Sequence, residues 1–522
     1  MAYNAIVTEQ PERQPEQRDN VSEPSASGRR VAVIGGGIAG LAAAHRLTEL
    51  APGCRPTLFD PRPRLGGVLE TIHEQGFQVE RSADNFITTL PWGLDLCRRL
   101  GLEDELVTTN AAYRRTFVVH RGRLRPLPDG FLMMAPTRMW PLAVTPLLSP
   151  WAKLRAGLEY FIPPRRDESD ESMAQFVRRR LGREAFDRLV EPLVSAVYAA
   201  DMERLSVAAT LSRFRDMERE HGSLIRAMRR QMAQRRRAAR GRTESAKNES
   251  AKNDSAKNDS AKSESGARYS MFVTLRRGLS SLIDALADRL PAGSVHLGRE
   301  VTQLQRTADG WRVDWREDRP SAGDDVPTSD VFDAVILATP SYVSARLLDS
   351  VDAELAGQLN QIEHSGTAIL SMGFDCGQIA HPLDGMGAVV PAVEGSPVLA
   401  MSFSSQKYPH RAPEGKTIVR VFVGGARRPE MVELPEQQLR DIVHGEVKRV
   451  LGVAGEPCYE DLARWPRTMP QYHVGHLDRV AGIETRVAEL PGLELAGNAF
   501  HGVGLPDCIH GGELAAERAL SE

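Results

Sequence analysis

The feature that most constrains the fold is a run of glycines that follows a short apolar segment near the start of the chain. After residues 31–34 come Gly35, Gly37 and Gly40 in the spacing G-x-G-x-x-G, and a stretch rich in alanine and leucine follows. In this pattern the first glycine permits a tight turn, the second lets backbone amides approach a pyrophosphate, and the third lets a helix pack closely on a strand. The pattern predicts a β-α-β unit, a parallel sheet and a dinucleotide site.

The residues after the glycines favour one dinucleotide. Asp60 ends a second predicted strand, residues 56–60, about 20 residues after the last glycine, where an acid can accept hydrogen bonds from a ribose. Arg64, Gly66 and Gly67 follow in a sequence that resembles the R-x-G-G element of flavoproteins. A glycine-rich turn without a ligand is the alternative. The combination predicts FAD as the cofactor.

Composition narrows the class of protein. Among 522 residues, 66 lysines and arginines oppose 69 aspartates and glutamates, for a formal charge of −3. A general nucleic-acid binder would usually carry a large basic excess, so we expect no nucleic-acid partner. Apolar stretches fall short of the roughly 18–20 residues of a membrane-spanning helix. The five cysteines never stand in C-x-x-C spacing. We expect a globular protein of the cytoplasm, and a homodimer stays open.

Two segments of biased composition divide the chain. Residues 1–28 are rich in Glu, Gln, Pro and Ser and predict a disordered tail, while residues 241–266 carry a Ser-Ala-Lys repeat and predict a solvated linker. Elsewhere hydrophobic spacing predicts helices across residues 172–199 and from about residue 511. The same reasoning predicts strands at residues 30–34, 295–304, 311–317, 334–338, 368–374, 398–403 and 418–423.

A second glycine-rich segment lies near the C-terminus. A predicted strand leads into Asn498, then Gly502, Val503 and Gly504, and the pair at residues 511–512 is predicted to open a helix. A helix N-terminus preceded by small residues can place amides against the pyrimidine side of a flavin, where negative charge develops on reduction. An ordinary turn between a strand and a helix is the alternative.

With these segments in view, the chain resembles the oxygen-dependent protoporphyrinogen and coproporphyrinogen III oxidases, of the flavoprotein group that includes monoamine oxidases and phytoene desaturases. Residues 192–201 are similar to the family's S-G-V-Y-A-G-D element, residues 275–282 to its G-G-L-x-x-L, and residues 502–508 to its G-V-G-[IL]-x-D-C. The resemblance runs from about Arg30 to the C-terminus, apart from the linker.

The resemblance implies an α/β plus α fold in three parts. A discontinuous, Rossmann-like FAD-binding domain is expected from residues 29–95, 267–345 and 480–522. Residues 96–125 and 346–479 are expected to form a mixed-sheet substrate domain, and residues 126–240 a helical lobe that lies where related enzymes bind membranes. Trp140 and Trp151 in that lobe fit an interfacial surface, although a helical cap on the substrate domain fits them equally well.

The resemblance also implies which residues hold FAD. They are Gly35, Gly37, Ile38, Ala39, Gly40, Asp60, Arg64, Gly66, Gly67, Val68, Ser82, Ala83, Asp84, Asn85, Val301 on the adenine side, and Asn498, Val503, Gly504 and Leu505 on the isoalloxazine side. Residues 82–85 depart from the family's usual G-P-x-S, so we do not expect this loop to follow the family's conformation in every detail.

A flat apolar macrocycle with propionates requires an apolar slot with a cation at its edge. By resemblance the substrate residues are Ala196, Met386, Val389 and Phe422, although apolar residues on strands are as often plain core. The family's propionate-binding arginine falls on Thr116 in an ungapped alignment. Arg115 becomes the candidate after a shift of one residue, but neighbouring strand residues face opposite sides.

The activity implied by the resemblance is oxidation of a porphyrinogen to a porphyrin, with O2 as acceptor and hydrogen peroxide as by-product, in haem biosynthesis. Residues 87–90 hold no lysine, which favours protoporphyrinogen IX slightly over the more acidic coproporphyrinogen III. No acid-base side chain is assigned because the flavin carries the chemistry. No metal is assigned either. An amine oxidase or carotenoid desaturase, and a flavoprotein without turnover, are the alternatives.

Overall fold

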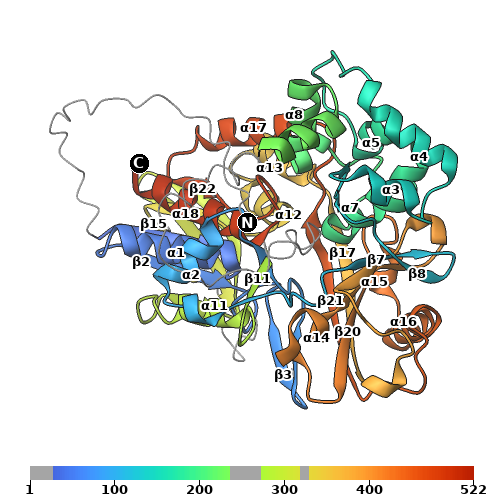
Figure 1. Cartoon of the computed structure of the whole chain (residues 1–522). Helices are drawn as coiled ribbons and strands as arrows, with labels where there is room; N and C mark the ends of the chain where they lie inside the picture. Colours follow the sequence, from blue (N-terminus) through green and yellow to red (C-terminus); the bar gives the residue numbers. More distant parts are fainter. Residues whose placement is uncertain (1–27, 235–271, 318–327, 522) are drawn as a thin grey trace, which may run out of the picture.

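The computed structural model describes residues 28–234, 272–317 and 328–521. The predicted linker lies outside these residues, as does the predicted tail except for Gly28. Figure 1 shows two halves: a parallel sheet with its helices on the left, and a larger sheet with a group of helices above it on the right.

The left half is built on a five-stranded sheet in which every neighbouring pair is parallel. Its strands, in spatial order, are β12 (Val295–Leu297), β2 (Arg55–Asp60), β1 (Arg30–Ile34), β16 (Ala334–Leu337) and β22 (Leu493–Leu495). By position in the chain this order is third, second, first, fourth, fifth, which is that of a Rossmann-like sheet. The predicted β-α-β opening is therefore confirmed, with α1 (Ile38–Leu50) as its helix.

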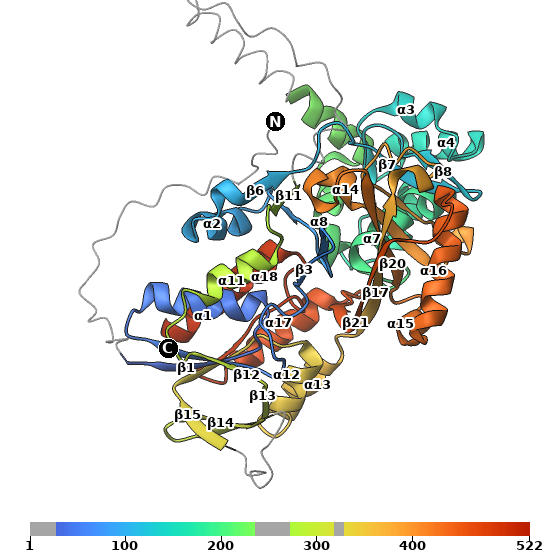
Figure 2. The same cartoon turned by 90° about the horizontal axis from the view of Figure 1, so that it is seen from below.

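Both faces of this sheet are covered, as expected for parallel strands. Val31 and Val33 pack with Leu41 and Ile336 beneath a layer formed by α1, α2 (Trp92–Arg99), α11 (Ser280–Ala287) and α18 (Leu505–Ser521). Ala32 and the opposite side chains pack against an antiparallel meander of β13 (Arg299–Thr307), β14 (Gly310–Glu317) and β15 (Thr328–Phe332). Figure 2 shows these two layers on opposite sides of the strands.

Two sequence predictions in this half are wrong in detail. The strand expected at residues 295–304 is two strands, because Gly298 takes a φ of +66° and sends β12 and β13 into different sheets. The last helix begins at Leu505 and not at Gly511. Gly512 lies inside α18 because a Cβ there would stand 2.1 Å from the carbonyl oxygen of Ala39, so the glycine serves the packing of α18 on α1.

The right half is built on a seven-stranded mixed sheet. Its strands, in spatial order, are β21 (Tyr459–Pro470), β17 (His364–Asp375), β20 (Lys416–Gly424), β19 (Val398–Phe403), β18 (Gly387–Val389), β7 (Thr116–His120) and β8 (Arg123–Pro126). Only the β18–β7 pair among them is parallel. One face packs Val421 and Val423 against α16 (Glu436–Leu451).

The other face of this sheet meets the helical group, which confirms the prediction of helices across residues 172–199. Val118, Val389 and Ala400 from the sheet share one core with it. Its helices include α3 (Met139–Val144), α4 (Pro150–Gly157), η2 (Leu158–Phe161), α5 (Met173–Leu181), α6 (Arg183–Ala185), η3 (Phe186–Val190), α7 (Glu191–Tyr198) and α8 (Val207–His221).

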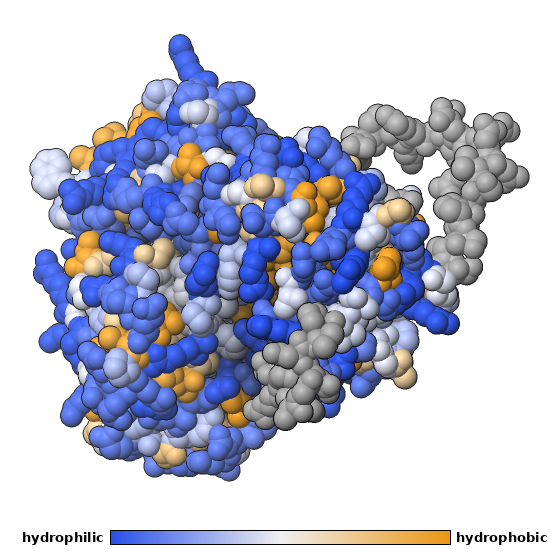
Figure 3. All heavy atoms as spheres, turned by 180° about the vertical axis from the view of Figure 1, so that it is seen from behind, coloured by the Kyte–Doolittle hydropathy of each residue, from blue (hydrophilic) through white to orange (hydrophobic). Residues whose placement is uncertain are grey.

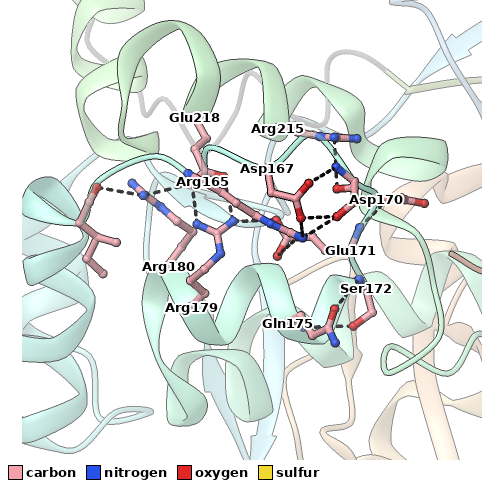
Figure 4. Close-up of polar contacts among 12 residues, drawn as sticks. Arg165, Asp167, Asp170, Glu171, Ser172, Gln175, Arg179, Arg180, Arg215 and Glu218 are labelled. Carbon is pink, nitrogen blue, oxygen red and sulfur yellow. Dashed lines mark hydrogen bonds and ion pairs between the residues drawn. The ribbon is translucent and has the colours of Figure 1, made fainter.

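An ionic network ties the helical group together (Figure 4). Arg179 donates to Glu171 Oε1 at 2.6 Å and to Glu218 Oε2 at 2.9 Å. Arg180 and Glu159 are both fully buried and form an ion pair. Glu159 also accepts from the backbone amides of Leu224 at 2.7 Å and Ile225 at 3.1 Å, so it caps the helix that starts there.

Candidate cofactor and substrate site

The first glycine segment forms an open cradle at the N-terminus of α1. Gly35 has a φ of +113°, and a Cβ there would stand 2.5 Å from the carbonyl oxygen of Ala338. A Cβ on Gly40 would stand 1.9 Å from the carbonyl oxygen of Gly35. A Cβ on Gly37, by contrast, would meet no atom within 4 Å. The backbone at Gly37 therefore faces open space, where an anionic group could approach the helix N-terminus.

Asp60 fixes this cradle from the end of β2. Its carboxylate is buried, and it accepts from the amide of Gly36 at 2.7 Å and from the amide of Arg62 at 2.8 Å. Each carboxylate oxygen keeps a further lone pair, so a ribose hydroxyl could still donate to it. The role predicted for Asp60 is compatible with this position and stays a prediction.

The second glycine pair closes on the first. The amide of Gly66 donates to the carbonyl of Gly36 at 2.8 Å, and a Cβ on Gly67 would stand 3.2 Å from the Cα of Gly37. Arg64 donates to the carbonyl of Gly67 at 2.7 Å, which holds the loop in place. Val68 packs against the β17–β21 side of the larger sheet, so this loop spans both halves. Val301 is buried against the five-stranded sheet, in the core that contains Phe59.

The C-terminal glycine segment is held by the larger sheet. Tyr472 donates its hydroxyl to the carbonyl of Asn498 at 2.6 Å, and the Asn498 amide donates to the carbonyl of Thr468 at 3.1 Å. Val503 and Gly504 come directly before α18, so the segment predicted to contact the flavin lies at a helix N-terminus. The amides there point to a region where negative charge is favoured.

The loop at residues 82–85 lies close to this helix N-terminus. A Cβ on Gly93 would stand 3.0 Å from the ring of Phe86 and 3.4 Å from Pro506, so both segments meet at the start of α2. The structure thus brings together Phe86 and Pro506, which directly follow residues 82–85 and 498–505. The resemblance assigns residues 498 and 503–505 to the isoalloxazine side and residues 82–85 to FAD without a side. The structure also brings together the glycines of the pyrophosphate cradle.

Three cations surround Asp84, one from the larger sheet and two from short helices beside it, and sequence reasoning missed all three. Asp84 Oδ2 lies 3.1 Å from Lys407 Nζ, 3.4 Å from Arg420 Nη1 and 3.7 Å from Arg411 Nη1. Burial alone would raise the pKa of Asp84, but these positive charges outweigh it and hold the pKa well below its ordinary value. Arg420 was detectable as a cation in the middle of the apolar run at residues 418–423 of β20.

The predicted slot residues fall in two places. Phe422 pairs with Ile369 and Ala400, and Ala400 pairs with Val389, so Phe422 and Val389 lie in one row on the face toward the helices. Met386 is buried just before β18 and is outside this row. Ala196 is exposed on α7, the helix that packs over β19.

The structure does not bring Arg115 to that face. Its side chain is 66% exposed, precedes β7 and pairs with Asp384 at 3.1 Å. Thr116 pairs with Gly387, Gly387 pairs with Ser402, and Ser402 pairs with Arg420. These residues form the row next to that of Phe422. The arginine in this row is therefore Arg420 of β20 and not one from β7. Because side chains alternate along a strand, Arg115 falls on the opposite side. The role of Arg115 in binding a propionate stays a prediction, and the position of its side chain argues against that role.

Two further features bear on the class of site. Within residues 28–234, 272–317 and 328–521, His, Cys, Asp and Glu side chains nowhere gather in threes that could hold a metal ion. Over the same residues, no helix combines the length and apolar character needed to cross a membrane.

Comparison with known proteins decides the family. A family described as flavin-containing amine oxidoreductases matches residues 38–520. The chain belongs to this family. Within it, the chain is 40% identical over 502 residues to a coproporphyrinogen III oxidase of Propionibacterium freudenreichii subsp. freudenreichii, covering 95% of this chain and 92% of that one. It is 32% identical over 498 residues to a coproporphyrinogen III oxidase of Bacillus subtilis (strain 168), covering 94% and 98%.

A solved structure agrees with these relatives. A crystal structure from Exiguobacterium sp. 255-15, provisionally named a protoporphyrinogen oxidase, superposes with a TM-score of 0.79 at 29% identity and covers 95% of this chain and 99% of that one. The resemblance to porphyrinogen oxidases drawn from the sequence motifs is confirmed, and so is the choice of FAD as the cofactor of this flavoprotein.

Proposed function

We propose that the protein oxidises a porphyrinogen to its porphyrin with FAD, using O2 and releasing hydrogen peroxide. The observation that carries this proposal is the identity of 40% and 32% with two coproporphyrinogen III oxidases over nearly the full length of each chain. The open cradle at Gly37 supports it, since the cradle leaves room for the cofactor.

The residues of this chain bind and orient the cofactor in the proposal. The amides of Gly37 and Ile38 hold the pyrophosphate, and Asp60 accepts from the ribose. Residues 82–85 and 498–505 contact the isoalloxazine. When bound, FAD accepts two electrons at a time, and removal of six hydrogens from the substrate therefore requires three cycles. Phe422, Val389 and their row supply an apolar surface against which the macrocycle lies.

Coproporphyrinogen III is the substrate we propose first. The sequence favoured protoporphyrinogen IX slightly, because residues 87–90 hold no lysine. Two relatives above 30% identity carry the name coproporphyrinogen III oxidase, and this similarity outweighs the absence of lysine from residues 87–90. Basic charge near the site comes instead from a cluster that sequence spacing did not reveal, the cations around Asp84.

The test is incubation of the FAD-loaded protein with each porphyrinogen in air, followed by porphyrin fluorescence and a peroxide assay. We expect porphyrin from coproporphyrinogen III at a higher kcat/KM than from protoporphyrinogen IX. A preference for the second would reverse the substrate assignment. No porphyrin above the rate without protein, from either compound, would overturn the proposed function.

We also propose that the helical group rests on a membrane surface. Five large apolar side chains of this group are more than half exposed: Trp140 by 76%, Val144 by 57%, Trp151 by 80%, Leu154 by 56% and Phe161 by 72%. They lie on the neighbouring elements α3, α4 and η2. Figure 3 shows the molecule from behind, where hydrophilic side chains cover most of the surface and apolar ones form separate small groups. Exposed tryptophans beside aliphatic residues are typical of interfacial binding.

Sedimentation with vesicles of phosphatidylcholine and phosphatidylglycerol tests this surface. We expect the double variant Trp140→Ser/Trp151→Ser to bind vesicles at least tenfold more weakly. Val393→Ser, at an exposed apolar residue outside this group, should bind like the native chain. Equal binding by both variants, or a concentration-dependent dimer lost only in the double variant, would contradict the membrane role.

A further inference from the structure

The cations around Asp84 come from a different half of the molecule than Asp84 itself. Asp84 belongs to the loop after β4 (Phe77–Glu80), whereas Lys407 ends α14 (Ser404–Lys407), Arg411 ends η6 (Pro409–Arg411) and Arg420 lies in the middle of β20. Arg411 also donates to the carbonyl of Asp84 at 2.9 Å, and Arg420 donates to the carbonyl of Ser82. The larger sheet and the two short helices beside it therefore bind both the side chain and the backbone of this loop.

Charge in the cluster does not balance. Lys407, Arg411 and Arg420 face two carboxylates, those of Asp84 and Glu80, and Arg411 reaches Glu80 only at 3.5 Å. The neighbouring group of Arg64, Arg81, Glu70 and Asp461 is neutral in itself. By formal charge, one positive charge is thus in excess, at a place where Arg411 is 0% and Arg420 is 1% exposed. Burial there lowers the pKa of Lys407 and of Arg420 and raises the pKa of Glu80.

Two of the arginines also keep unused donors. Among the described residues, Nε and Nη1 of Arg411 and Nε of Arg420 have no hydrogen-bond partner, although all three atoms are buried. An uncompensated cation and unsatisfied donors in the interior both cost stability. A fold that retains them gains something other than stability from them, and an anionic or electron-accepting neighbour would account for the excess charge.

The position of the cluster indicates which group this neighbour is. The loop that the cations bind lies close to the N-terminus of α18. Phe86, directly after the loop, and Pro506, in the first turn of α18, both border Gly93. Residues 82–85 and 503–505 are the segments that contact the isoalloxazine in the proposed function. A positive charge behind one of these segments stabilises negative charge on a reduced flavin.

We propose that Asp84 is a positioning residue that holds residues 82–85 against the flavin through Lys407, Arg411 and Arg420, and that the excess positive charge of these cations raises the reduction potential of the flavin. The inference rests on the FAD binding of the proposed function but not on the identity of the substrate.

Lys407→Met tests the role of the charge. Lys407 is the member of the cluster nearest the solvent, with 18% of its side chain exposed, and its removal leaves two arginines facing two carboxylates. The variant should therefore fold. We expect its flavin midpoint potential to fall by about 30 mV or more, equivalent to tenfold in a two-electron equilibrium. Lys416→Met, which removes an exposed lysine paired with Asp375, is the matched control and should leave the potential unchanged.

The double variant Asp84→Asn/Lys407→Met separates positioning from charge. It keeps the excess of one positive charge, since Arg411 and Arg420 then face Glu80 alone, but it loses the carboxylate that anchors the loop. We expect a potential near that of the native protein and an FAD dissociation constant at least tenfold higher, measured by ultrafiltration and flavin fluorescence. The single variant Asp84→Glu, which keeps a carboxylate at this position, should bind FAD more tightly than the double variant.

Specific results would overturn the inference. A potential in Lys407→Met equal to that of the native protein removes the electrostatic role. Native FAD affinity and a native visible circular dichroism spectrum of the flavin in the double variant remove the positioning role. None of these measurements uses a porphyrinogen, so a failed porphyrinogen assay would leave the inference standing and would count only against the proposed function.

Discussion

Two fully buried arginines show how differently two regions of the molecule use charge: the helical group and the cluster around Asp84. Arg180 in the helical group bonds through every nitrogen of its guanidinium: Nε to Glu159, Nη1 to the carbonyl of Ile162 and Nη2 to the carbonyl of Gly222. Arg411 beside Asp84 bonds through Nη2 alone among the described residues. The difference indicates that the first arginine organises packing and the second belongs to a site.

The surrounding charges follow the same division. Near Arg180, the three arginines at 165, 179 and 180 face the three buried carboxylates of Glu159, Glu171 and Glu218. Near Arg411, three cations face two carboxylates. A balanced network can hold helices together at little electrostatic cost, whereas an unbalanced one is costly unless it acts on a ligand.

The largest effect is expected from Glu159→Ala. The substitution leaves Arg180 buried without its carboxylate and removes the cap of the helix that starts at Leu224, so the free energy of unfolding should fall by about 3–5 kcal/mol. Urea denaturation measures this, with Arg183→Ala as control because Arg183 is 86% exposed. If the folded variant showed an altered flavin spectrum, the helical network would not be purely structural.

Gly37→Val should affect only the cofactor. Gly37 has a φ of −74°, which any residue adopts, and its Cβ would meet no protein atom, so the chain should fold. The added side chain fills the space proposed for the pyrophosphate. FAD affinity should fall about a hundredfold, which corresponds to about 2.7 kcal/mol. Gly357→Val on α13 (Ala353–Asn360), whose Cβ also meets open space, is the matched control. Native FAD affinity in Gly37→Val would place the cofactor elsewhere.

Acidification should release FAD through Asp84. Because the folded pKa of Asp84 is held below its ordinary value of 3.8, its contribution is present above about pH 4 and is lost as the pH falls through the folded value. FAD retention in the native protein should therefore decline in this range, below about pH 4, whereas retention by the double variant Asp84→Asn/Lys407→Met should be lower but flatter with pH. Parallel curves for the two proteins would contradict the role of Asp84.

The smallest effect compares two adjacent glycines in α18. Gly512→Ala places a Cβ 2.1 Å from the carbonyl oxygen of Ala39 and should destabilise by about 1–3 kcal/mol. Gly511→Ala meets no atom within 4 Å and should stabilise by about 0.5–1 kcal/mol, because alanine is the better helix former. Thermal denaturation measures both. The same sign for both variants would show that α18 does not pack on α1 as described.

Local patterns predicted much of the fold. The strands at residues 30–34 and 398–403 match β1 and β19, since their β-branched and apolar runs are decided by local sequence. The glycine motif predicted the cradle for the same reason. Gly511 and Gly512 misled because a glycine pair is typical of a helix end, while here contact with Ala39 requires a glycine inside the helix.

What the sequence could not predict depends on strand register. Arg420 shares a row with Ser402 and Gly387 only because three strands from distant segments pair in that register. The same parity places Arg115 away from the face that holds Phe422, which no local pattern reveals. The cations around Asp84 were missed because they come from one half of the molecule and Asp84 from the other, so no local pattern brings them together.

The most direct test of the proposed function is anaerobic mixing of the FAD-loaded protein with coproporphyrinogen III. We expect the visible band of oxidised flavin to bleach as the substrate is consumed, and the band to return when O2 is admitted, with Gly37→Val showing neither change. An oxidised flavin band that stays unbleached with both coproporphyrinogen III and protoporphyrinogen IX would contradict the assignment as a porphyrinogen oxidase.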